Sequence, residues 1–182
     1  MRRREIRIAG FGGQGIVLSG SIVGKAASIY DGKFAVLTQS YGPESRGGSC
    51  RAEVVISEAP VGYPYVINPQ VQVILSQEAY REYGQVGHPD TLVIVDSDLV
   101  SFAPHVNPRL FCIPASRMAQ ELGRPVVANI IVLGFLAAKS DIVSYEALKK
   151  AILDSIPRGT EELNMKAFEM GYKYDSGHTN GG

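Results

Sequence analysis

Four glycines within six residues, close to the N-terminus, form the motif that most clearly predicts chemistry. Residues 6–18 read IRIAGFGGQGIVL, which indicates a short buried strand, a glycine-rich turn and the start of an apolar helix. Glycine has no side chain, so such a turn can adopt positive φ angles and lets a bound group approach the backbone. The following helix places about half a unit of positive charge at its N-terminus, which favours phosphate. The motif therefore predicts an anion site formed by Gly10, Gly12, Gly13, Gln14 and Gly15.

The spacing of Gly10, Gly12 and Gly15 also matches the dinucleotide-binding fingerprint, although a single match is weak evidence. A nicotinamide site needs an acidic residue at the end of the second strand, where it would hold the ribose. That strand is expected at 34–38 and leads into Gln-Ser-Tyr, while Asp31 lies before it. NAD binding is therefore disfavoured. A tight strand-to-helix turn without any ligand is the other alternative.

A second glycine-rich loop, residues 39–49, follows the second expected strand. Ligands of open α/β sheets bind at the carboxyl ends of the strands, so this loop is expected beside the first glycine turn. Arg46 is its best cationic candidate for a phosphate or for a partner's carboxylate, and a surface arginine without a role is the alternative. The candidate residues of the loop are Tyr41, Gly42, Pro43, Glu44, Arg46, Gly47 and Gly48.

Length and composition fit one α/β domain and argue against several classes of protein. The 182 residues are 45% hydrophobic, and 18 basic residues balance 18 acidic ones, so no basic excess points to nucleic acid. No apolar run reaches the ~20 residues of a membrane span, and residues 2–4, Arg-Arg-Arg, lack the apolar segment of a secretory signal. Cys50 and Cys112 are isolated, so they cannot ligate a metal or an iron–sulfur cluster alone. Two reduced thiols in a cytoplasmic protein are expected.

Strands and helices alternate along the chain. Further strands are expected at 49–58, 71–76, 91–96 and 109–114, the first of them half-exposed and at an antiparallel edge. Helices are expected at 16–30, 77–83, 115–123, 125–138, 144–153 and 160–171. This order predicts a single three-layer α/β/α domain, Rossmann-like, with a mostly parallel sheet. The domain is expected to span 1–182, with its core at about 5–172 and a mobile tail at 173–182.

Four other polar residues are expected near the ends of these elements. Asp96 and Asp98 follow a strongly apolar strand and could hold a metal or a ribose, but capping of the next segment is favoured. Ser116 is a candidate cap of the helix at 115–123. Asn129 lies near the first turn of an apolar helix, where it can face the sheet edge at which the loops gather.

Together these motifs resemble the gamma subunit of 2-oxoacid:ferredoxin oxidoreductases. The resemblance rests on GFGGQG at 10–15, on SYGPESRGG at 40–48, and on Pro-Arg-Gly at 157–159 before Asn164 and Gly171. It covers nearly the whole chain, from Ile6 to Gly171. The Tyr-Gly-Pro-Glu form of the second motif is most similar to the 2-oxoglutarate type, with the pyruvate type or another 2-oxo acid as the alternative.

The resemblance implies a subunit of a hetero-oligomeric oxidoreductase, inactive when isolated. The family's complex decarboxylates a 2-oxo acid on thiamine diphosphate, passes electrons through iron–sulfur clusters to ferredoxin, and transfers the acyl group to coenzyme A. Thiamine diphosphate, Mg and 4Fe-4S clusters are then carried by the alpha and beta partner subunits, with a delta subunit as a further candidate. No cofactor, metal ligand or catalytic residue is expected on this chain alone.

The gamma component of this family is associated with coenzyme A binding and with closing the complex. We therefore expect backbone N–H groups around Gly12–Gly15 and the loop Tyr41–Gly48 to line the path of coenzyme A, with Arg46 near its phosphates. The alternatives are that this loop docks on the alpha subunit, or that the chain is a non-catalytic scaffold. A stand-alone NAD-dependent oxidoreductase is less favoured.

Overall fold

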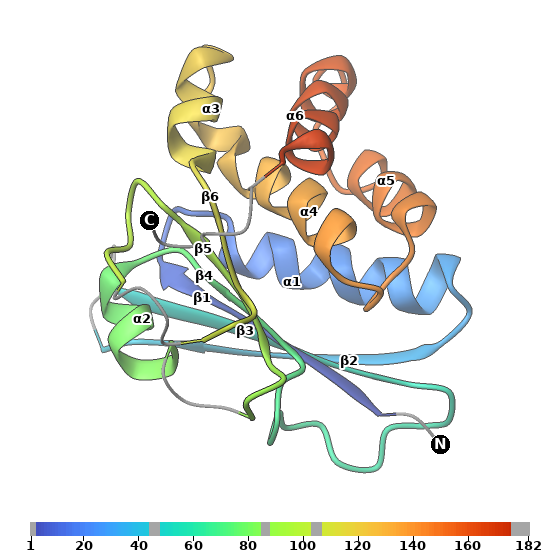
Figure 1. Ribbon diagram of the computed structural model, residues 1–182. Helices are drawn as coiled ribbons and strands as arrows, with labels where there is room; N and C mark the ends of the chain where they lie inside the picture. The colour runs from blue at the N-terminus through green and yellow to red at the C-terminus, as the bar shows by residue number, and fades with distance from the viewer. Residues whose placement is uncertain (1–2, 44–47, 85–87, 103–106, 176–182) are drawn as a thin grey trace.

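Six strands form one mixed sheet in the computed structural model, which describes residues 3–43, 48–84, 88–102 and 107–175 (Figure 1). Their order across the sheet is β2-β3-β1-β4-β5-β6. The strands are β1 (Arg4–Phe11), β2 (Phe34–Tyr41), β3 (Ser49–Ser57), β4 (Val71–Ile74), β5 (Leu92–Asp96) and β6 (Leu110–Ile113). β1, β4, β5 and β6 pair in parallel, whereas β3 pairs antiparallel with both β1 and β2. Because β3 alone reverses direction among these six strands, the expected mostly parallel sheet is confirmed.

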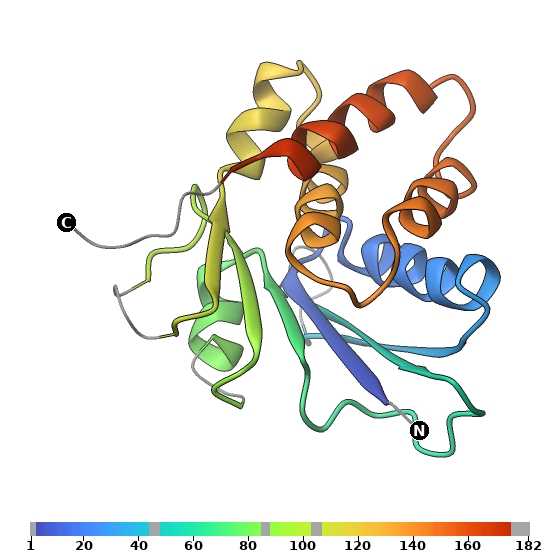
Figure 2. The same ribbon diagram turned by 45° about the vertical axis from the view of Figure 1, so that its right-hand side comes forward.

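Helices cover both faces of the sheet, most of them on one side (Figures 1 and 2). One face carries α1 (Ile16–Lys25), α3 (Ala115–Glu121), α4 (Ala128–Lys139), α5 (Tyr145–Leu153) and α6 (Glu161–Lys173). The other carries α2 (Gln77–Tyr83). Strand residues such as Ile8 and Val54 join the larger core, and Ile74 and Val95 join the smaller core against α2. The expected three-layer α/β/α arrangement is confirmed.

The place of β3 in the sheet corrects the sequence-based prediction. β3 lies between β2 and β1, so the edge strand is β2. Its inward residue Val54 is buried as expected, but Glu53 and Val55 on its other face are buried too. β2 also continues beyond the expected end at Thr38, because its backbone pairs with β3 as far as Tyr41 opposite Cys50.

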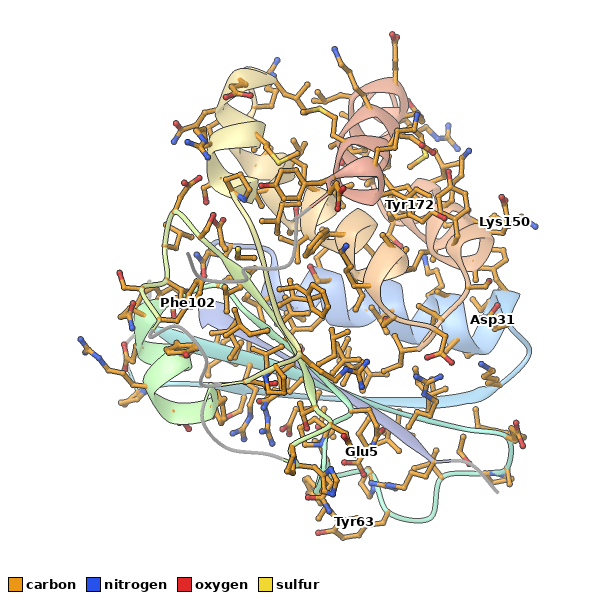
Figure 3. All side chains as sticks on the ribbon, viewed as in Figure 1. Glu5, Asp31, Tyr63, Phe102, Lys150 and Tyr172 are labelled. Carbon is orange, nitrogen blue, oxygen red and sulfur yellow. The ribbon has the colours of Figure 1, made fainter. Side chains whose placement is uncertain are left out.

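Two side chains near the N-terminus hold the segment between β3 and β4 against the sheet by hydrogen bonds to its backbone. Arg3 donates through its guanidinium to the carbonyl oxygens of Tyr63 and Tyr65, at 2.7 and 2.6 Å. Glu5 Oε2 accepts from the backbone N–H groups of Ile67 and Asn68, both at 2.7 Å. Figure 3 shows Glu5 and Tyr63 on the side of the sheet away from α4 and α6.

Two predicted helices have the expected extent but are not α-helical throughout. α1 is followed by a short π-helical turn, Ala26–Tyr30, and α4 is preceded by a 3-10 turn, Pro125–Val127. Residues 176–182 lie outside the described chain, so the tail and the domain limits stay predictions. Within the described residues, no helix has the length and apolar character needed to cross a membrane.

Candidate functional site

The two glycine motifs meet at the carboxyl edge of the sheet. β1 and β2 both end there, and the loop after β2 returns into β3. The backbone N–H of Gly12 donates to the carbonyl oxygen of Gly48 at 2.9 Å, and that of Gly42 donates to Ser49 at 2.7 Å. The structure therefore brings the first turn beside the described ends of the second loop, as the sequence predicted.

The first turn opens the N-terminus of α1. Gly13 and Gly15 have φ angles of 93° and 73°, in the left-handed region that favours glycine. Gly15 is the N-cap, so this position supplies no side-chain cap. The first hydrogen bond of the helix runs from the N–H of Ser19 to the carbonyl oxygen of Gly15, at 2.8 Å. The N–H groups of residues 16–18 precede that bond and point out of the open end of the helix.

The side chain of Gln14 fills part of this turn. Its Oε1 accepts from the backbone N–H of Phe11 at 2.6 Å, and its Nε2 donates to the carbonyl oxygen of Leu75 at 2.7 Å. A Cβ at Gly10 would lie 2.3 Å from Gln14 Oε1. The missing side chain at Gly10 therefore leaves space that the Gln14 side chain fills. The sequence had predicted a bound ligand in this space.

One cavity, of about 160 Å³, opens on the side of the sheet that carries α2. It is lined by Gly10, by Tyr41 and Gly42 of the second motif, and by Arg51 and Tyr83. Arg51 donates to the hydroxyl of Tyr83 at 2.7 Å. The sequence did not single out Arg51, although the alternation of β3 places it on the face opposite to Val54.

A second cavity, of about 140 Å³, lies on the other side of the turn, between the turn itself, α3 and the start of α4. Gly13 and Gln14 line it together with Asp96, Ser116 and Asn129. Asn129 comes from the first turn of α4 and faces this edge, as expected. The glycine turn therefore separates two small cavities, and residues of the first motif line both.

The acidic pair at the end of β5, Asp96 and Asp98, caps helix α3. Asp96 Oδ2 accepts from the backbone N–H and the hydroxyl of Ser116, at 2.9 and 2.7 Å, and its Oδ1 accepts from the N–H of Asp98 at 3.0 Å. Asp98 in turn accepts from the N–H of Arg117 at 3.0 Å. Capping, the favoured reading, is confirmed. The N-cap position itself is Pro114, so Ser116 does not act as the side-chain cap predicted for it. Burial raises the pKa of Asp96, against these hydrogen bonds, which lower it.

Residues 5–174 match the family model described as pyruvate ferredoxin/flavodoxin oxidoreductase. The chain belongs to this family. It is 52% identical over 174 residues to the 2-oxoglutarate synthase subunit KorC of Methanocaldococcus jannaschii, with 94% of this chain and 93% of the relative covered.

Two solved structures extend this family membership. A keto/oxoacid ferredoxin oxidoreductase gamma subunit from Geobacter sulfurreducens has 43% identity and a TM-score of 0.85, covering 94% of this chain and 95% of that one. A 2-oxoglutarate:ferredoxin oxidoreductase from Magnetococcus marinus, described with 2-oxoglutarate, coenzyme A and succinyl-CoA bound, has 25% identity and a TM-score of 0.82. There, 94% of this chain matches 31% of the longer one. The resemblance to gamma subunits, and the oxidoreductase class, are confirmed.

In this family member, part of the second motif lies outside the described residues. Glu44, Arg46 and Gly47 are among them, so their roles stay predictions. Tyr41 is 62% exposed at the end of β2, and Pro43 is exposed beside it. Within the described chain, no group of three or more His, Cys, Asp or Glu residues is placed to hold a metal ion.

Proposed function

We propose that this chain is the gamma subunit of a cytoplasmic 2-oxoglutarate:ferredoxin oxidoreductase, in which it helps to bind coenzyme A. The observation that carries the proposal is its 52% identity, along nearly its full length, to a 2-oxoglutarate synthase subunit. The complex would convert 2-oxoglutarate and coenzyme A to succinyl-CoA and CO₂, with two electrons passed to ferredoxin. This chain would contribute binding groups and contacts between subunits, and its partners would carry the reaction centre.

The geometry of the glycine turn supports a role in coenzyme A binding. Gly12 and Gly13 are exposed, and the N-terminus of α1 is open beside them. Such an end attracts phosphate groups, and coenzyme A carries a pyrophosphate and a ribose phosphate. The structurally similar Magnetococcus marinus enzyme is described with coenzyme A bound.

The cysteine residues support placing the redox cofactors on partner subunits. Cys50 belongs to the larger core and Cys112 packs against the smaller one, so the two thiols lie on opposite faces of the sheet. They cannot ligate one iron–sulfur cluster together. Burial raises the pKa of both thiols, and both are free, which fits a reducing cytoplasm.

The assembled complex tests the proposal. Ferredoxin reduction that requires coenzyme A should be faster with 2-oxoglutarate than with pyruvate, and the isolated chain should show none. Arg46→Ala should raise the KM for coenzyme A in a complex that still assembles. Arg109→Ala is the matched control, because Arg109 lies just before β6 at the opposite edge of the sheet.

Two results would contradict parts of this proposal. An Arg46→Ala variant that dissociates would assign the loop to subunit docking. Calorimetry with coenzyme A, on complexes with and without this chain, separates a binding subunit from a scaffold: equal affinity in both would show a scaffold. A preference for pyruvate would refute the assignment of 2-oxoglutarate.

A further inference from the structure

Strand β2 forms an edge of the sheet that lacks the usual protections against pairing. Its eight residues, FAVLTQSY, are all described, and they include no charged residue, no proline and no bulge in the register with β3. The opposite edge is different, because β6 has four residues and ends directly before Pro114. Proteins usually keep edge strands from pairing with other chains by making them short or by adding charges, prolines or bulges. β2 is therefore open to a strand from outside this chain.

The hydrogen-bond pattern of β2 shows which of its backbone groups point outward. In an antiparallel pair, residues bonded to the neighbouring strand alternate with residues whose N–H and C=O point away from it. The N–H of Gly42 donates to the carbonyl oxygen of Ser49 at 2.7 Å, in the same register as the pairs between β2 and β3. Even-numbered residues of β2 therefore bond to β3. The residues whose backbone groups point outward are Ala35, Leu37, Gln39 and Tyr41.

An antiparallel second copy of β2 can pair with all four of these residues in one register. That register places Thr38 opposite Thr38 of the other copy, on a two-fold axis. The bonded pairs are then Leu37 with Gln39 and Ala35 with Tyr41, each occurring twice. Each pair would exchange two hydrogen bonds, which gives about eight in all. Any other antiparallel register leaves at least one of the four residues unpaired.

The side chains of β2 also fit this register. Residues directly opposite each other share a face of the sheet, where like charges repel, and β2 has no charge to repel its own copy. Tyr41, 62% exposed, would lie opposite the small side chain of Ala35, and Phe34, 47% exposed, opposite Gly42. The two Thr38 hydroxyls on the axis can bond to each other. A different protein would be selected by complementary charge, which this strand does not offer.

We propose that two copies of this chain associate through β2, by antiparallel pairing centred on Thr38. The two sheets then form one continuous sheet, with α1 of both copies on the same side. A two-fold axis is the commonest symmetry of soluble oligomers, and it needs only this one surface on each chain. The proposal is independent of the proposed function, because it uses neither coenzyme A nor the 2-oxo acid.

Cysteine cross-linking of the full chain tests both the contact and its register. Thr38→Cys places two thiols directly opposite each other across the axis, with Cα atoms about 4.5 Å apart, which is within the range of a disulfide. Oxidation with copper phenanthroline should convert most of this variant to a linked pair of chains on a non-reducing gel. Val36→Cys, on the same face of β2, is the matched control. Val36 lies opposite Ser40, so its two thiols would be four residues apart along the strands, roughly 13 Å, too far for a disulfide.

A proline at position 39 tests the backbone pairing itself. The Gln39 N–H points outward, so Gln39→Pro removes a donor to the second copy but none to β3. Sedimentation of the full chain across micromolar concentrations should show a monomer–dimer equilibrium, and this variant should raise its dissociation constant about tenfold or more. Gln39→Thr is the matched control, because it keeps the N–H and should leave the dimer intact. Thermal unfolding verifies that each variant is folded.

Several results would overturn the association through β2. A wild-type chain that stays monomeric at all these concentrations would refute it, and so would equal cross-linking of Thr38→Cys and Val36→Cys. A dimer that Gln39→Pro leaves unchanged would assign the association to another surface. In the assembled complex, a short bismaleimide should join two copies of the Thr38→Cys chain. A product that joins this chain to a different subunit would show instead that β2 pairs with a strand of that subunit.

Discussion

Gly12 and Gly48 are joined by a backbone hydrogen bond of 2.9 Å, from the N–H of the first to the carbonyl oxygen of the second. This bond links the two glycine motifs across the carboxyl edge of the sheet. Because of this bond, the Gly12 N–H is not available to a ligand. The Phe11 N–H is not available either, because it donates to Gln14 Oε1. The N–H of Gln14 also donates, to the carbonyl oxygen of Phe11 at 3.3 Å, so the backbone donor left between Phe11 and Gln14 is that of Gly13, which lines the same cavity as Asn129.

Gly10→Ala should lower the free energy of unfolding by about 1–3 kcal/mol, the usual cost of overpacking. The new Cβ would lie 2.3 Å from Gln14 Oε1 and 2.9 Å from Ile16 Cδ1. Urea unfolding measures the change. In a Gln14→Ala background the same substitution should cost less, because one clash is gone. Gly62→Ala is the control, since nothing lies within 4 Å of its Cβ. Fully additive costs of the two substitutions would contradict the role assigned to Gln14.

Glu53→Gln should lower the free energy of unfolding by about 3 kcal/mol, because it leaves buried arginine charge uncompensated. The Glu53 side chain is 9% exposed, with Oε1 2.7 Å from Arg7 Nε and Oε2 3.7 Å from Arg51 Nε. Asp141→Asn provides the contrast. It removes the 2.6 Å ion pair with Arg4, but the Asp141 side chain is 78% exposed, so its cost should stay below about 1 kcal/mol. If urea unfolding gave the same loss of stability for both variants, burial would not determine how much these ion pairs stabilise the protein.

Gly171→Ala should prevent α6 from packing against α4. Its Cβ would lie 1.8 Å from the carbonyl oxygen of Ile131, a backbone atom that cannot rotate away. We expect a loss of at least about 3 kcal/mol of stability, and faster proteolysis within α6. Gly24→Ala in α1 is the control, because its nearest neighbour is Val54 Cγ1 at 3.9 Å. That change should stabilise the protein by up to about 1 kcal/mol through helix propensity. A Gly171→Ala protein as stable as wild type would refute the close crossing.

Tyr145 should make stability depend on pH in the alkaline range. Its hydroxyl donates to Glu169 Oε1, and this hydrogen bond with burial raises the pKa of Tyr145 to about 12. The unfolded tyrosine has a pKa of about 10, so the folded state holds this proton more tightly. Its contribution is complete below about pH 10 and is lost as the pH rises towards about 12.

Denaturant unfolding across this pH range should show that loss in the wild type and a smaller one in Tyr145→Phe. The tyrosinate absorbance of the wild type minus that of Tyr145→Phe, followed against pH, should give the titration midpoint of Tyr145 itself. The same hydrogen bond lowers the pKa of Glu169, so a second loss of stability is expected as the pH falls below about 4.5. A midpoint for Tyr145 at the ordinary tyrosine value would contradict the pairing with Glu169.

The residue patterns along the chain predicted the strands and helices well, but they did not predict which strands lie side by side in the sheet. The alternation in β3 correctly predicted a strand with Cys50 and Val54 facing inward. It could not reveal that the strand lies inside the sheet, because alternation reports one buried face only. Glu53, on the other face, is also buried, and there it pairs with Arg7, which is 46 residues away in the chain.

The candidate site shows the same limit. The glycine spacing predicted the turn and the open helix end, and the strand order predicted that the two motifs would meet. The glycine spacing could not predict that the Gln14 side chain occupies the space over Gly10, because that position depends on a hydrogen bond to the carbonyl oxygen of Leu75. Arg51 was missed for a similar reason, because its place in a cavity depends on Tyr83 from α2.

The sequence by itself determined the turn, the alternation of strands and helices, and the family, because these depend on residue types at short, regular spacing. Only the tertiary structure decided which polar groups of the site are already paired and which are left for a ligand. Asn129 and Asp96 were both candidates from their positions in the chain; in the structure both line one cavity, and Asp96 accepts hydrogen bonds from Ser116 of helix α3. The difference arises because a hydrogen bond is satisfied by whichever group lies within about 3 Å in space, whatever its distance along the chain.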